Sequence, residues 1–154
     1  MCRYESCEGI RRFLKAQEES YPIALREIQS GRKRSHWMWY IFPQLACLGR
    51  SETARYYGIR DEAEAREYWA DPVLSARLLE ISSALLEQTG TAWEIMRDPD
   101  DLKLRSSMTL FLAVSGHPVF RQVLDRFYHG EPDPYTLRFL NGQGPSSRSG
   151  GKED

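Results

Sequence analysis

Residues 71–90 read DPVLSARLLEISSALLEQTG and carry the clearest secondary-structure signals in the chain. Asp71 followed by Pro72 is typical of a helix start, because aspartate caps the first turn and proline fits the first helical position. Apolar residues then recur every three or four positions, at Leu74, Leu78, Ile81 and Leu85. Since Gly90 favours a helix end, the stretch predicts an amphipathic helix whose one apolar stripe faces a core.

The same helical period extends outward in both directions from this stretch. One helix is expected over residues 5–19, and a second is expected to begin near Ser20–Pro22 and to end at Gly31. The segment SHWMWYIF, residues 35–42, is expected to be a short helix or a buried turn. Further helix starts are predicted at Ser51, Asp61, Thr91, Asp98–Pro99, Pro118 and Asp133–Pro134.

These signals predict an all-α fold, an irregular single domain of about nine short helices. We expect this domain to cover residues 1–141. Residues 142–154 contain no apolar side chains that could join a core, and we expect them to form a disordered tail. The chain has 154 residues, of which 41% are hydrophobic, so one core can form without disulfides.

The charge balance limits the classes of partner. The formal net charge is −1, so the chain as a whole does not attract DNA or an anionic membrane. We therefore expect no sequence-specific DNA binding and no membrane association, and a cytoplasmic location. Neither a metal site nor a cofactor is expected, because the three cysteines and three histidines show no metal-type spacing.

A first acid-free window lies between Glu27 and Glu52 and contains the segment RKRSHWMWYIFPQ, residues 32–44. Guanidinium groups bind phosphate oxygens and aromatic rings stack on bases, so this mixture indicates a ligand that carries both groups. The candidate binding residues here are Arg34, Ser35, Trp37, Trp39, Tyr40 and Gln44. The alternative is that the aromatic side chains are core and that the cations form a solvated turn.

A second acid-free window lies between Asp101 and Asp125 and adds Lys103, Arg105 and Ser106 as candidate binding residues. Serine is a poor helix former, so its position within a helix indicates close approach of another group. That group is either a ligand or a neighbouring helix.

Three further residues are candidates for catalysis. His36 could act as a general base, and Glu94 or Asp101 could orient water toward an anomeric carbon. The alternatives are a structural histidine and carboxylates that cap helices.

The strings GRKRSHWMWYIFPQL, LGRSETARYYGI and KLRSSMTLF closely resemble the domain-of-unknown-function 1810 family of bacterial proteins. The resemblance extends from about Phe13 to Leu140 and implies an all-α fold without an established activity. Some members carry the label calpastatin. The sequence does not support that label, because a calpastatin is a disordered repeat protein and this chain has a core.

The run LLEQTGTAWEIMRDPDD, residues 85–101, resembles more weakly the NADAR (NAD- and ADP-ribose-associated) family. That likeness would match Thr89, Glu94 and one aspartate of residues 98–101. The chain lacks the Trp-Gly that usually follows the aspartate in that family, and it lacks a clear Glu-His pair.

Two functions remain open at this point, beside the possibility that the aromatic segment is only folding core and that function lies elsewhere. The first is a protein that binds, and as an enzyme would hydrolyse, a phosphate-bearing nucleotide-like ligand of the ADP-ribose or N-glycoside type. The second is a non-catalytic helical module whose aromatic segment docks a protein partner. The first requires the two acid-free windows to meet around one cavity.

Overall fold

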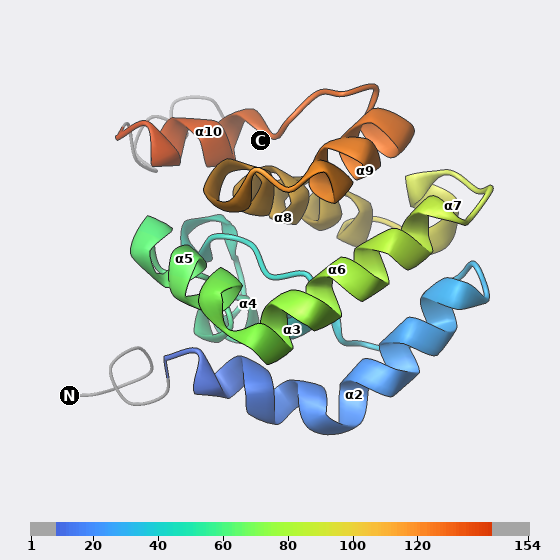
Figure 1. Cartoon of the computed structure of the whole chain (residues 1–154), viewed down its shortest axis with the longest axis horizontal. Helices are drawn as coiled ribbons and strands as arrows, with labels where there is room; N and C mark the ends of the chain where they lie inside the picture. The colour runs from blue at the N-terminus through green and yellow to red at the C-terminus, as the bar shows by residue number, and fades with distance from the viewer. Residues whose placement is uncertain (1–8, 143–154) are drawn as a thin grey trace.

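The computed structural model describes residues 9–142 and is all-α over that range, as predicted (Figure 1). The helices are α2 (Arg11–Gln29), α3 (Met38–Ile41), α4 (Glu52–Tyr56), α5 (Glu62–Ala70), α6 (Pro72–Leu86), α7 (Ala92–Met96), α8 (Asp100–Ser115), α9 (Pro118–Tyr128) and α10 (Pro134–Leu140), with a 3-10 turn, η1, at Ala46–Leu48. The predicted tail at residues 143–154 and the first eight residues lie outside this range.

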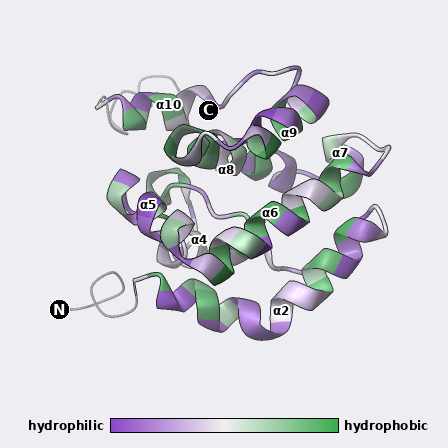
Figure 2. Ribbon diagram, viewed as in Figure 1, coloured by the Kyte–Doolittle hydropathy of each residue, from purple (hydrophilic) through white to green (hydrophobic). Residues whose placement is uncertain are grey.

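Helix α6 is the predicted amphipathic helix and lies at the centre of the fold. Asp71 accepts hydrogen bonds from the amides of Val73 and Leu74, and Pro72 occupies the first turn. The four residues of its apolar stripe are at most 1% exposed. Helix α6 contacts α2, α5 and α9, while α8 contacts α5, α7, α9 and α10. The apolar sides of these helices form one shared core, and Figure 2 shows hydrophilic and hydrophobic residues alternating along α2 and α9.

The prediction of two separate N-terminal helices was wrong. Helix α2 continues through Pro22 to Gln29. Its buried residues, among them Gln17, Tyr21 and Ala24, keep a helical spacing on both sides of the proline. Contact of this continuous stripe with α3 and α6 outweighs the backbone hydrogen bond that Pro22 cannot donate.

The predicted start of α8 at Asp98–Pro99 also needs correction. Helix α8 begins at Asp100, and no side chain caps it. Instead, the amide of Asp101 donates to the Arg97 carbonyl at 2.8 Å, and the amides of Leu102 and Lys103 donate to the Pro99 carbonyl at 3.0 and 3.1 Å. Backbone carbonyls therefore replace the expected aspartate cap.

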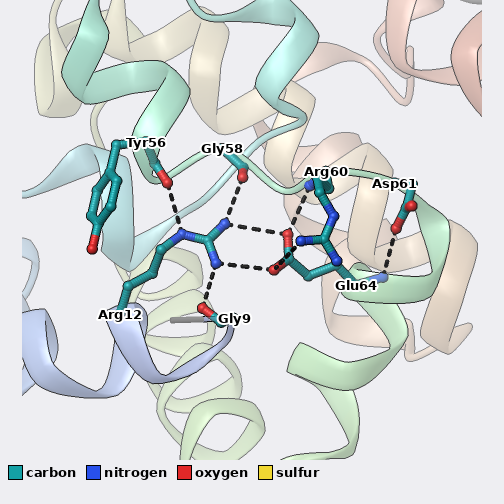
Figure 3. Close-up of polar contacts among 7 residues, drawn as sticks. All are labelled: Gly9, Arg12, Tyr56, Gly58, Arg60, Asp61 and Glu64. Carbon is teal, nitrogen blue, oxygen red and sulfur yellow. Dashed lines mark hydrogen bonds and ion pairs between the residues drawn. The ribbon is translucent and has the colours of Figure 1, made fainter. Parts of the chain in front are cut away.

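A buried ion pair joins α2 to α5 (Figure 3). The Arg12 guanidinium donates to both carboxylate oxygens of Glu64, at 2.9 and 3.2 Å. It also donates to the carbonyls of Tyr56 and Gly58, each at 2.7 Å, and to that of Gly9. The side chains of Arg12 and Glu64 are 2% and 0% exposed, so this network holds residues 56–60 against α2 and α5.

Residues 56–60 in turn position the segment that precedes η1. The Ile59 amide donates to the Gln44 carbonyl and the Ala46 amide donates to the Ile59 carbonyl, both at 2.8 Å. A Cβ atom on Gly58 would lie 2.3 Å from the Ala46 Cα, so glycine permits this close approach. Arg12 and Glu64 thus fix the backbone around Gln44 from a distance.

Between residues 9 and 142, no helix combines the length and the apolar character that a bilayer span requires.

Candidate functional site

A pocket of about 550 Å³ opens between the segment 44–51, helix α8 and the start of α10. Its walls come from Gln44, Leu48, Gly49, Arg50, Ser51, Ala54, Pro99, Leu102, Lys103, Arg105, Ser106, Asp133, Pro134 and Tyr135. Both acid-free windows contribute to these walls, the first through residues 44 and 48–51 and the second through residues 102, 103, 105 and 106. The volume is within the range of small-molecule sites.

Three cations of the described chain line this pocket. Arg50 is exposed on the loop between η1 and α4, and it forms no ion pair with any residue from 9 to 142. Lys103 lies one turn into α8, and its Nζ is 3.9 Å from the Asp100 carboxylate. Arg105 is partly exposed further along α8. All three line one space together with a single carboxylate of the described residues, Asp133, so the lining carries a net positive formal charge that suits an anion.

Arg105 also organises the wall that faces α8. Its Nε donates to the Glu131 carbonyl at 2.9 Å, and its Nη2 donates to the Pro132 carbonyl at 3.0 Å. Its ion pair with the exposed Glu131 carboxylate is long, at 3.7 Å. Arg105 therefore holds the loop that leads into α10.

Asp133 is the one carboxylate in the lining drawn from residues 9–142, and it caps α10. It is 8% exposed, and its Oδ2 accepts hydrogen bonds from the Ser106 hydroxyl at 3.1 Å, the Thr136 hydroxyl at 2.6 Å and the Thr136 amide at 3.0 Å. The Asp133 amide donates to the Thr109 hydroxyl at 2.8 Å. Ser106 thus joins α8 to the start of α10 and also lines the pocket.

A small second hollow adjoins the pocket. Gln44, Ala54 and Lys103 line both spaces, and Trp39 lines the second with Met38, Phe42 and Gly58. Of the three aromatic residues predicted to bind a ligand, Trp39 lines this adjoining hollow, and Trp37 and Tyr40 line neither space.

The segment 34–37 binds the Glu27 carboxylate of α2 and does not line the pocket. The Glu27 carboxylate accepts hydrogen bonds from the amides of Arg34 and Ser35 and from the Ser35 hydroxyl. It also accepts one from Trp37 Nε1 at 2.9 Å. Partial burial raises the pKa of Glu27, but these hydrogen bonds outweigh it and lower the pKa to about 2. Glu27, which accepts all these hydrogen bonds, is the acidic residue that immediately precedes the first acid-free window.

Four of the predicted site residues therefore lie away from the pocket. The Trp37 side chain is core, at 1% exposed, as the structural alternative expected. The Tyr40 ring packs on Tyr57 at 5.0 Å, and its hydroxyl shares a 3.2 Å hydrogen bond with Ser20. The other two residues, Arg34 and Ser35, donate their backbone amides to the Glu27 carboxylate.

His36 is exposed and does not line the pocket. Its carbonyl accepts a 3.4 Å hydrogen bond from the Tyr40 hydroxyl.

Lys33, a cation of the first window, contacts the start of α8 and the end of α7. Its Nζ pairs with the Asp100 carboxylate at 2.9 Å and lies 4.9 Å from the centre of the Trp37 ring. Its amide donates to the Ile95 carbonyl at 2.8 Å. The charge of Lys33 is thus already paired within the protein.

Neither carboxylate predicted to orient water lines the pocket. Glu94 forms a capping box with Thr91 at the start of α7. Asp101 is partly buried, and burial, with the neighbouring Asp98 and Asp100 charges, raises its pKa despite a hydrogen bond from the Leu102 amide. The structure therefore brings Gln44, Lys103, Arg105 and Ser106 together and leaves both acids outside.

Arg50, Asp133 and Tyr135 are lining residues with functional side chains that the sequence did not indicate as part of the site. Arg50 lay in the first window but was not selected, and Asp133 was interpreted as a helix cap only. Tyr135, whose ring lies 5.2 Å from the Arg138 guanidinium, offered no signal, since a tyrosine in a short amphipathic helix is usually structural. The described residues hold no cluster of histidine, cysteine or acid that fits a metal ion.

Comparison with known proteins gives two matches. The family model described as "Protein of unknown function (DUF1810)" matches residues 7–140. The crystal structure of the conserved hypothetical protein Rv1873 from Mycobacterium tuberculosis is similar, with a TM-score of 0.85 and 40% sequence identity, over 87% of this chain and 97% of that one. No curated protein gives a significant match. Neither match tests the likeness to the NADAR family or the calpastatin label.

Proposed function

The chain belongs to the DUF1810 family of proteins of unknown function, and we propose that its pocket binds a phosphate-bearing, nucleotide-like ligand. The observation that carries this proposal is the convergence of Arg50, Lys103 and Arg105 on one space. Guanidinium and ammonium groups in a partly enclosed site are the usual partners of phosphate oxygens.

The balance of charge in the pocket supports an anion. Asp133 offsets part of the positive charge, but its Oδ2 is already held by three protein donors. Arg50 has no acidic partner within residues 9–142, and the Lys103–Asp100 contact is long. Because these cations are weakly paired, an incoming phosphate would gain charge-assisted hydrogen bonds without breaking strong internal ones.

The remaining walls suit the less polar part of such a ligand. Leu48, Pro99 and Leu102 provide apolar surface, and Leu102 is 55% exposed. Tyr135 provides an aromatic ring on which a base could stack. Gln44 would provide a neutral amide for directional hydrogen bonding.

We propose binding and assign no hydrolysis to this site. Glu94 and Asp101, the carboxylates considered for water activation, lie outside the lining. The alternative of a docking module has less support, because Trp37 is buried and Trp39 is partly covered. Interface anchors need to be reachable in the free protein.

A binding titration tests the proposal. The protein is titrated calorimetrically with ADP-ribose, ADP, NAD and adenosine, and its melting temperature is measured with each. We expect the phosphate-bearing compounds to bind and adenosine to bind more weakly or not at all. A ligand at about 100 times its Kd stabilises the fold by about 2.7 kcal/mol. Absence of binding by every phosphate compound at millimolar concentration contradicts the proposal.

A further inference from the structure

One oxygen of the Asp133 carboxylate has no protein partner. All three donors that reach this side chain bind Oδ2, and no residue between 9 and 142 donates to Oδ1. Asp133 is more than nine-tenths buried, yet it lines the pocket. Among the described residues, the buried side-chain oxygen without a partner is that of Ser107, so Asp133 Oδ1 still reaches solvent. Because Asp133 lines the pocket, this oxygen is an acceptor that is open to a ligand there.

The surrounding charges restrict which donor this oxygen can take. An ammonium group would be attracted by Asp133 but repelled by the cations Arg50, Lys103 and Arg105. A neutral donor on an otherwise anionic molecule satisfies both parts of the pocket. On a phosphate ester, the most common neutral donor is a sugar hydroxyl.

We infer that Asp133 Oδ1 accepts a hydrogen bond from a hydroxyl of the ligand, so that the pocket takes sugar phosphates in preference to inorganic phosphate. This inference rests on the proposed function, since it concerns the same pocket. In this arrangement the cations hold the phosphate, and Asp133 selects for the sugar. Arg105 supports the selection indirectly, because its hydrogen bonds to the Glu131 and Pro132 carbonyls hold the loop that carries Asp133.

The substitution Asp133→Asn separates this role from the structural one. The Thr136 amide can only donate, so it requires the amide oxygen of the new side chain at the Oδ2 position. The amide nitrogen then takes the Oδ1 position and converts the acceptor into a donor. Asparagine is also a good N-cap, so α10 is retained.

The experiment measures calorimetric affinity of the wild type and of Asp133→Asn for ribose 5-phosphate and for inorganic phosphate. In the wild type, ribose 5-phosphate should bind at least about tenfold more tightly than phosphate, as expected for a hydrogen bond to a charged group. The substitution should remove this preference and should not weaken phosphate binding. An unchanged preference, or equal weakening of both ligands, overturns the inference.

A second comparison needs no variant, in case Asp133→Asn impairs folding. The wild type should bind ribose 5-phosphate more tightly than butyl phosphate, an ester without hydroxyl groups, and equal affinity overturns the inference. Different outcomes of the same titrations test the proposed function. If the wild type binds phosphate and ADP-ribose but shows no hydroxyl preference, only the role of Asp133 fails. If it binds none of these compounds, the proposed function fails as well.

Discussion

The buried pair of Arg12 and Glu64 and the pocket lined by Arg50, Arg105 and Asp133 each combine arginine with a carboxylate, and they differ in how completely the protein pairs those charges. In the buried pair (Figure 3), the Arg12 guanidinium donates to Glu64 and to three backbone carbonyls. In the pocket, Arg50 has no acidic partner among the described residues, and one oxygen of Asp133 has no donor. In the first arrangement every charge has a protein partner, whereas the second leaves charged groups available to a ligand.

The difference shows that local charge alone does not identify a ligand site. Arg12 lies in a helix with acidic residues nearby in sequence, and Arg50 lies in an acid-free window, yet Lys33 in the same window is fully paired with Asp100. What distinguishes a binding cation is the absence of an internal partner in three dimensions. Clusters whose charges are paired within the protein should therefore affect stability, and the pocket should affect affinity.

The largest effect is expected at the buried pair. Glu64→Ala leaves the Arg12 charge buried without its counter-ion, which should lower the free energy of unfolding by about 3–5 kcal/mol. Urea denaturation measures this loss. The double variant Arg12→Met/Glu64→Leu should lose less than the sum of the single changes, because no unpaired charge remains. A loss below about 1 kcal/mol for Glu64→Ala would mean that this pair behaves like a surface salt bridge.

The pocket cations should show the opposite behaviour. Lys103→Ala should weaken ADP-ribose binding about tenfold or more, since it removes a charge-assisted hydrogen bond. Its melting temperature should change little, because its contact with Asp100 is long and partly exposed. Arg121→Ala is the matched control, as Arg121 is an exposed cation of α9 outside the pocket. Equal affinities for both variants would remove Lys103 from the site.

The Glu27 cluster should show up in the dependence of stability on pH. The pKa of Glu27 falls from 4.5 to about 2 on folding, so its contribution is complete above pH 4.5 and is lost as the pH falls toward 2. Because the group is partly solvated, the contribution is about 1 kcal/mol after allowance for screening. Denaturation at several pH values should show a shallower acid loss in Glu27→Gln than in the wild type. An identical slope would show that the four donors do not bind a charged carboxylate.

The smallest effect is expected at Glu94. Glu94→Ala removes the side-chain half of the α7 capping box, the 2.9 Å hydrogen bond from the Thr91 amide. Stability should fall by about 0.5–1 kcal/mol, and ADP-ribose affinity should be unchanged. Calorimetry and thermal melting measure the two quantities. A loss of affinity without a loss of stability would return Glu94 to the candidate site.

The sequence predicted most of the fold, because the signals for its helices are local. Caps such as Asp71 and Asp133 bind amides two or three residues away, and the α6 stripe lies within fifteen residues. The prediction failed at Pro22, where contacts with distant helices keep α2 continuous. The helix propensity of Pro22 and its neighbours does not include the stabilisation that these tertiary contacts provide.

The site was predictable only in part, for the same reason. Lys103 and Arg105 stood out because the sequence after Asp101 holds no acid up to Asp125, and Ser106 because serine is a poor helix former. All three line the pocket. Trp37 stood out equally, but its partner Glu27 comes from another helix and draws it into the core. Arg50 and Asp133 are far apart in the chain, and only the folded structure places them around one space.

The most direct test of the central claim is a crystal structure of the protein soaked with ADP-ribose. The account predicts density for the ligand in the pocket, with its phosphates near Arg50 and Lys103 and a ribose hydroxyl on Asp133 Oδ1. Ligand bound at another surface, or an unchanged pocket at a concentration where solution binding is saturated, would contradict it.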